Sequence, residues 1–168
     1  MLAIGVEPLD TTDSLGAGKS QVINLYNVED SDIQENPFKS IYLETTAELT
    51  SVKFSNNSKF MMVSTSENLL LLLDAMSGEI IRKFTDYPNS EGLNLEACFS
   101  PDSKFIMTGD AKGKLHIWTT SQEEEKEEAS EIVTLDEHFL PVMCLQMNPK
   151  FGVLASSCQN TILWQPTD

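Results

Sequence analysis

The chain has 168 residues, of which 40% are hydrophobic, and it carries a formal net charge of −15 at pH 7. This length predicts one domain with enough apolar residues for a sizeable core. The negative charge disfavours direct binding to nucleic acid or to an anionic membrane, because both would add like-charge repulsion, and it is compatible with basic partners.

The residue pattern predicts fourteen short β-strands and no helix. Apolar and β-branched residues recur in runs of about five, the usual strand length, between groups of turn residues. The expected strands are residues 2–6, 21–26, 39–43, 49–54, 60–64, 69–73, 79–84, 95–99, 105–109, 114–118, 132–135, 142–147, 153–157 and 161–164. The five consecutive leucines at 69–73 lack alternation, which predicts a strand that is buried on both faces.

A turn sequence recurs at nearly constant spacing. The run FSNNSKF at 54–60 precedes FSPDSKF at 99–105 by 45 residues, and a looser copy, MNPKF, occupies 147–151. Pro101 stands at the second position of a type I turn, where its fixed φ is already suitable. Gly113, in the following turn, can adopt a positive φ. The strand ends keep step at intervals of 47, 45 and 46 residues, at Tyr26, Leu73, Trp118 and Trp164.

A four-stranded repeat of about 40–45 residues, with a Trp closing the third strand, is typical of a propeller blade. The sequence therefore predicts an all-β fold, a partial WD-repeat β-propeller over residues 1–168 with about four blades. The expected units are 1–45, 49–85, 94–136 and 141–165. The first unit lacks an innermost strand and the last an outermost one. We therefore expect the C-terminal portion of a longer protein, or a homodimer that pairs open blade edges.

Three cysteines, Cys98, Cys144 and Cys158, accompany no secretory leader, which predicts a reducing compartment without disulfides. Cys98 and Cys144 fall on the same side of equivalent innermost strands. We expect both to be small buried residues and neither to be a metal ligand or a nucleophile.

The run Gly16–Ser20 (GAGKS) resembles the end of a phosphate-binding loop. That motif needs a glycine five residues before Gly18, where Asp13 stands, and a helix after Ser20. Because residues 21–26 predict a strand, a hairpin loop is favoured. A phosphate-binding or hydrolytic propeller is the enzymatic alternative.

Two sets of polar residues occupy positions at which WD-type blades form buried hydrogen-bond networks. They are Thr108, Asp110 and Trp118 in the third unit, and His138, Ser156 and Trp164 in the fourth. The first set lacks a His within residues 85–93, and the second lacks an Asp within 158–160. Neither set contains a nucleophile–base pair or a set of metal ligands. We expect structural roles for these blade positions, and no catalytic residue, cofactor or metal.

An acidic run interrupts the third unit between its third and fourth strands. Its carboxylates are Glu123, Glu124, Glu125, Glu127 and Glu128. The run is either a contact for a basic partner segment or a solvated extension of a hairpin loop, and the second interpretation is favoured.

Three runs, at 95–107, 144–151 and 164–167, together resemble the WD repeat-containing protein 82 family. Members of that family are propeller subunits of the COMPASS histone methyltransferase complex, and the likeness corresponds to the C-terminal half of a seven-bladed protein. The resemblance implies a nuclear, non-enzymatic scaffold that binds the methyltransferase subunit and links it to the phosphorylated tail of transcribing RNA polymerase II. It also implies roles in transcription termination and messenger RNA 3′-end processing. A WD-repeat interaction module of another complex is the alternative.

Overall fold

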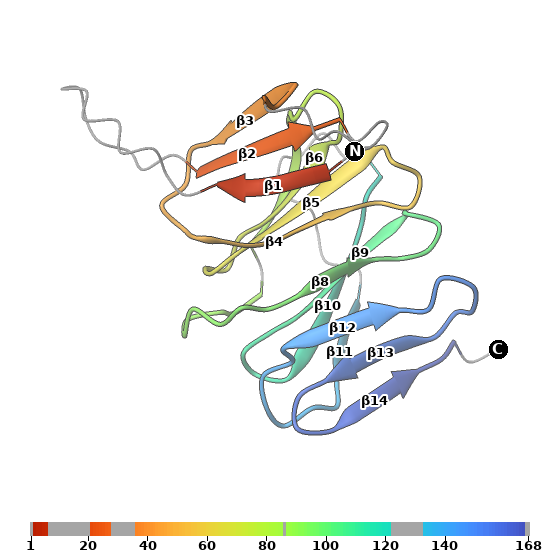
Figure 1. Cartoon of the computed structure of the whole chain (residues 1–168). Coiled ribbons are helices and arrows are strands. Elements are labelled where there is room, and N and C mark those ends of the chain that lie inside the picture. Colours follow the sequence, from red (N-terminus) through yellow and green to blue (C-terminus); the bar gives the residue numbers. More distant parts are fainter. Residues whose placement is uncertain (1, 7–20, 28–35, 86, 122–132, 167–168) are drawn as a thin grey trace.

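The computed structural model describes residues 2–6, for which it gives the backbone only, and residues 21–27, 36–85, 87–121 and 133–166. These residues form fourteen strands and no helix. The described residues therefore contain no helix that is long and apolar enough to cross a membrane. The strands belong to four antiparallel sheets that follow one another in chain order (Figure 1).

The first sheet has the order β1-β2-β3 and the second the order β4-β5-β6-β7. The first contains β1 (Leu2–Val6), β2 (Gln21–Tyr26) and β3 (Lys39–Leu43). The second contains β4 (Leu49–Phe54), β5 (Phe60–Thr65), β6 (Leu70–Asp74) and β7 (Ile80–Phe84).

The third sheet has the order β11-β10-β9-β8 and the fourth the order β12-β13-β14. The third contains β8 (Ala97–Phe99), β9 (Phe105–Gly109), β10 (Lys114–Thr119) and β11 (Val133–Asp136). The fourth contains β12 (Cys144–Met147), β13 (Leu154–Ser157) and β14 (Thr161–Trp164).

All fourteen predicted strands are confirmed, with bounds that differ by no more than two residues. The start of β12 shows why such bounds shift. Val142 was expected in this strand, but its N–H donates to the Asp110 carbonyl oxygen of the third sheet at 3.1 Å. Because that donor is engaged by the neighbouring sheet, the β12 ladder begins at Cys144.

Three apolar clusters lie between successive sheets, as in neighbouring propeller blades. Strand β6 contributes to two of them, as its lack of alternation predicted. Leu71 and Leu73 join the cluster shared with the first sheet, whereas Leu70 and Leu72 join the cluster shared with the third. All four side chains are buried. The chain is thus a partial β-propeller in which each sheet stabilises the next.

The two copies of the repeated turn have the same geometry. Ser58 donates its N–H to the Ser55 carbonyl at 3.0 Å, and Ser103 donates to the Ser100 carbonyl at 2.9 Å. The turn predicted around Pro101 is therefore confirmed. Ser58 and Ser103 both have left-handed backbones, with φ of 59° and 61°. This conformation is uncommon for residues other than glycine, so the repeat conserves an unusual geometry as well as a sequence.

The expected burial of Cys144 is wrong. Cys98 is buried between the third and fourth sheets, but Cys144 is exposed. Cys144 pairs with Ser157, and Gln146 lies on the same face of β12. No described sheet covers that face. The two cysteines therefore occupy equivalent sides of equivalent strands but differ in burial, because burial depends on the next sheet.

Candidate functional site

A buried carboxylate organises the turn between β9 and β10. Asp110 is 0% exposed. Its Oδ1 accepts hydrogen bonds from the backbone amides of Lys112 and Lys114, both at 2.8 Å, and its Oδ2 lies 3.0 Å from Nε2 of His116. A buried carboxylate is costly unless it is hydrogen-bonded. These donors therefore fix the turn and attach it to the middle of β10.

The imidazole ring of His116 connects the Asp110 carboxylate to the indole ring of Trp118. The two rings are stacked, with centroids 5.7 Å apart and planes at 15°. Trp118 is fully buried and also contacts Phe84, with ring centroids 5.2 Å apart. Its Nε1 finds no hydrogen-bond acceptor within the described part of the chain. Trp118 is therefore held by ring packing.

The residues expected in the third unit do not form one network. Thr108 donates its hydroxyl to the Glu96 carbonyl at 3.0 Å and does not join Asp110 to Trp118. The imidazole that contacts Asp110 belongs to His116, on β10. It does not come from the connection at 85–93, where WD-type blades would place a histidine. The sequence did contain a signal for His116. Side chains alternate between the two faces of a strand, so the residue two positions before Trp118 lies on the same face as Trp118.

A second chain of hydrogen bonds lies between the third and fourth sheets. Both Nε2 of His138 and Nε1 of Trp164 lie 2.7 Å from the Ser156 hydroxyl oxygen. Nδ1 of His138 lies 3.2 Å from Sγ of Cys158. Burial lowers the pKa of His138, because desolvation penalises the imidazolium. The structure thus brings the three expected residues together and adds a thiol.

Cys158 stands where the third sheet has Asp110. Trp118 pairs with Ile106, and Trp164 pairs with Leu154. Counting forward from these partners aligns Thr108 with Ser156 and Asp110 with Cys158. The chain from Leu154 to Trp164 is two residues shorter than the chain from Ile106 to Trp118. Counting back equal distances from the two tryptophans therefore does not align Cys158 with Asp110. Only the strand register reveals it.

The central residues of both networks are buried, whereas the Cys158 thiol at one end of the second network is partly exposed. Ser156 is 1% exposed and His138 is 4% exposed. Among the described residues, no group of three or more His, Cys, Asp or Glu side chains is placed to hold a metal ion. We propose that both networks act structurally, by fixing turns and the spacing between sheets.

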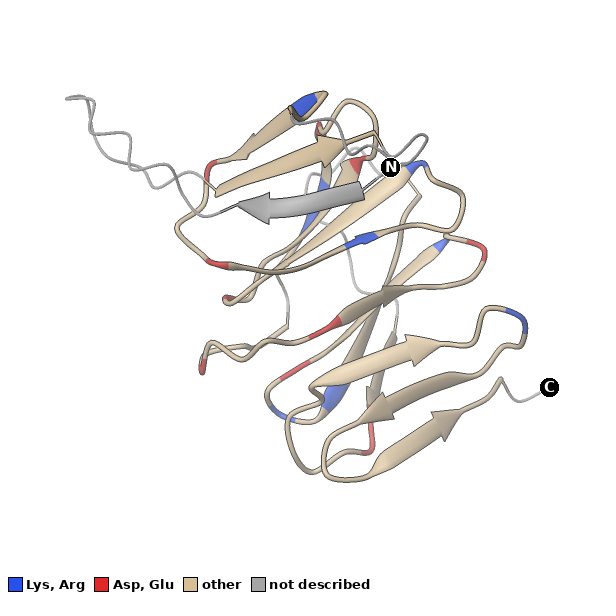
Figure 2. Cartoon of the chain, in the orientation of Figure 1, with Lys and Arg blue, Asp and Glu red and all other residues tan. Residues whose placement is uncertain are grey.

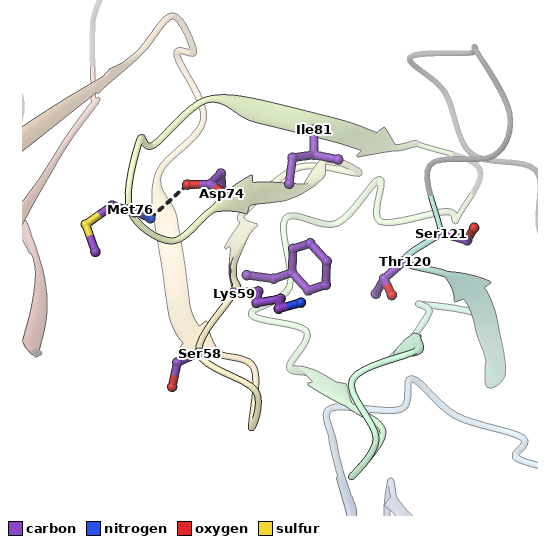
Figure 3. Close-up of a pocket in the computed structure, with 8 residues that line it drawn as sticks. Ser58, Lys59, Asp74, Met76, Ile81, Thr120 and Ser121 are labelled. Atoms are coloured by element: carbon purple, nitrogen blue, oxygen red, sulfur yellow. Dashed lines mark hydrogen bonds between the residues drawn. The ribbon is translucent and has the colours of Figure 1, made fainter.

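An open groove of about 600 Å³ lies between the second and third sheets at one rim (Figure 3). Its lining residues are Ser58, Lys59, Phe60, Asp74, Met76, Ile81, Thr120 and Ser121. The amides of Ser77 and Met76 donate to Asp74 at 2.7 and 2.9 Å and hold the pKa of its carboxyl below the usual value. With one ammonium, one carboxylate, hydroxyls and apolar side chains, the groove suits contact with another polypeptide better than catalysis.

The acidic run that contains Glu123, Glu124, Glu125, Glu127 and Glu128, interpreted above as a solvated loop extension or, alternatively, as a partner contact, lies outside the described residues. The phosphate-loop-like run at 16–20 lies outside them as well. Among the described residues, Figure 2 shows Lys and Arg distributed over several strands and turns. That distribution differs from the clustered basic face typical of nucleic-acid binding.

Comparison with known proteins finds one matching family model and several similar relatives. Residues 93–119 match the family described as "WD domain, G-beta repeat". The chain is 38% identical to WD repeat-containing protein 82 of Drosophila melanogaster, over 88% of this chain and 45% of that protein. It is 28% identical to COMPASS component SWD2 of Saccharomyces cerevisiae, over 92% of this chain and 49% of that protein.

A further relative is Set1 complex component swd2 of Schizosaccharomyces pombe, which is 31% identical over 61% of this chain and 32% of that protein. The chain therefore spans less than half the length of these relatives. The matched segment at 93–119 covers strands β8, β9 and β10, with the buried Asp110, His116 and Trp118.

Proposed function

We propose, because the chain belongs to the WD repeat-containing protein 82 and Swd2 family, that it is a WD-repeat subunit of a Set1/COMPASS-like histone methyltransferase complex. The observation that carries this proposal is the 38% identity to the Drosophila protein along 88% of the chain. Two other relatives have names that describe them as COMPASS or Set1 complex components.

We further propose that the subunit is non-enzymatic. The central side chains of both polar networks are buried, and the groove described above is lined by hydroxyls, one ammonium, one carboxylate and apolar side chains. A propeller that presents rims and sheet faces to other chains suits a scaffold. The partner would be the methyltransferase subunit, and the site of action the nucleus.

The finer role follows from the family resemblance alone. We propose that the subunit links the methyltransferase to the phosphorylated tail of RNA polymerase II and contributes to transcription termination and messenger RNA 3′-end processing. No residue of this chain is assigned to phosphopeptide binding. The charge of −15 makes a phosphate-binding surface here unfavourable without a local cluster of basic side chains.

Homodimerisation through the open edges of the first and fourth sheets is a separate proposal. Its support is that each of these two sheets has three described strands, whereas the second and third sheets have four. Light scattering of the purified chain tests it. A mass of twice the chain would support the homodimer, and a monodisperse monomer would contradict it.

Affinity purification of the tagged chain from its source cells, followed by mass spectrometry, tests the scaffold function. We expect recovery of a Set1-type methyltransferase and its associated subunits, at levels above those from untagged cells. Recovery of a folded, soluble chain without any methyltransferase subunit would overturn the proposal.

A further inference from the structure

We propose that the connection between β11 and β12, residues 137–143, is a docking loop whose Phe139 side chain enters an apolar pocket of a basic protein partner. The inference rests on the proposed scaffold function and assigns a surface to it. The loop lies on the side of the third and fourth sheets that also carries the β9–β10 turn, because the two segments are hydrogen-bonded.

The loop exposes one aromatic side chain close to two buried residues of the same segment. Phe139 is 93% exposed, whereas His138 is 4% and Val142 0% exposed. Leu140 and Met143 are also exposed, at 41% and 38%. A single exposed apolar residue is ordinary on a protein surface. The distinguishing feature here is that an almost fully solvated phenylalanine belongs to a firmly held backbone.

Hydrogen bonds hold the loop on both sides of Phe139. Before it, the His138 side chain bonds to Ser156 at 2.7 Å. After it, Val142 donates to the Asp110 carbonyl at 3.1 Å. Met143 then donates to the Ser157 carbonyl at 3.1 Å. Both the third and the fourth sheets therefore fix the segment that presents Phe139.

Two glycines let the loop lie directly on the third sheet. A Cβ on Gly113, which has a φ of +93°, would stand 2.1 Å from the His138 carbonyl oxygen. A Cβ on Gly109 would stand 2.3 Å from the carbonyl oxygen of Val142. Such close backbone packing restricts the loop before a partner binds. The loop would therefore lose little conformational entropy on binding. A rigid aromatic side chain on a preorganised loop is the usual composition of an interface anchor.

The charge of the chain favours a basic partner over a second copy. Two copies, each carrying −15, would repel one another, whereas a basic protein would be attracted. Glu137, the first residue of the loop, is exposed. Its neighbour Asp136 pairs with Lys114 at 3.1 Å. The complementary surface is an apolar pocket that accepts one aromatic ring and has Lys or Arg side chains at its border.

A photo-crosslinking amino acid placed at position 139 in the full chain, expressed in the source cells, identifies the partner. The matched control is position 151, because Phe151 is also exposed, at 67%, but lies in the β12–β13 turn. We expect position 139 to crosslink a different, basic protein that position 151 does not reach. The absence of a crosslink specific to position 139, or a crosslink only to a second copy of the chain, would overturn the inference.

Binding of that crosslinked protein, purified, is then measured with the wild-type chain, Phe139→Ala and Phe151→Ala. We expect Phe139→Ala to raise the Kd roughly 30-fold or more, as for an interface hot spot, and Phe151→Ala to change it less than about threefold. An unchanged Kd for Phe139→Ala would overturn the inference. A confirmed partner that belongs to no methyltransferase complex would contradict the proposed function while supporting this docking loop.

Discussion

The backbone N–H of Asn57 donates a hydrogen bond to the hydroxyl oxygen of Ser103 at 3.3 Å, which joins two copies of the same turn in successive sheets. Asn56 adds a second contact through its side-chain amide, which donates to the Pro101 carbonyl at 3.2 Å. Ser103 is 2% exposed and its carbonyl accepts from Thr120 at 2.8 Å. The repeated turn therefore also sets the spacing between the sheets.

Ser103→Ala should lower the free energy of unfolding by about 1–2 kcal/mol, because the Asn57 amide loses its acceptor in a partly buried position. Ser58→Ala is the matched control, since Ser58 has nearly the same φ but an exposed side chain. The control should change stability by less than about 0.5 kcal/mol. Denaturant titration measures both, and equal effects would show that the contact between turns contributes nothing.

Acidification should destabilise the chain through His138. Its pKa in the folded state is lowered by burial, so the unfolded state binds the proton more readily. Stability is therefore highest above the unfolded imidazole pKa of about 6.5, and it falls as the pH decreases from there towards the folded pKa. One proton limits the slope to about 1.4 kcal/mol per pH unit.

Thermal unfolding of wild type and His138→Gln between pH 7.5 and 5.5 checks this expectation, and the variant should have a flatter pH profile. A pH profile unaffected by His138→Gln would contradict the assignment.

Asp74 and Asp102 affect stability at lower pH. Their pKa values are lowered, chiefly by the Ser77 amide for Asp74 and by the Ser100 hydroxyl for Asp102. Their contribution is present above about pH 4 and is lost as the pH falls through the folded pKa values.

Gly109→Ala should destabilise the fold by about 1–3 kcal/mol, because overpacking against a neighbouring backbone forces displacement. The new methyl group would stand 2.3 Å from the Val142 carbonyl oxygen of the docking loop. Gly152→Ala is the control, since its Cβ would meet only Pro166, at 3.4 Å. Unfolding midpoints of the two variants test the contrast. A Gly109→Ala protein as stable as wild type would mean that the loop does not sit on β9 as described.

The three thiols should react with N-ethylmaleimide in an order set by exposure and ionisation. Burial raises the pKa of Cys98 to about 11, so little thiolate is present at pH 8 and its sulfur is also inaccessible. Cys144 is exposed and should be modified first. Peptide mass spectrometry over a time course measures the order. Labelling of Cys98 as fast as Cys144 in the folded chain would contradict the packing of the third and fourth sheets.

Local chemistry made most of the strands predictable. Turn residues and β-branched runs repeat along the chain, so each strand has a local signal, as at 105–109. The sequence also indicated His138, Ser156 and Trp164 as one group, and the structure places them in hydrogen-bond contact. The pairing of Asp110 with His116 was missed because it depends on a turn folding back over β10.

By itself, the sequence determined the repeat, the positions of the strands and the two-sided burial of residues 70–73, because these depend on period-two alternation and turn chemistry within about 45 residues. Only the tertiary structure decided that Cys158 replaces Asp110, that Cys144 is exposed and that Phe139 projects from a fixed loop. These features depend on strand register and on which sheet packs next. Residues far apart in sequence set both, so no local pattern encodes them.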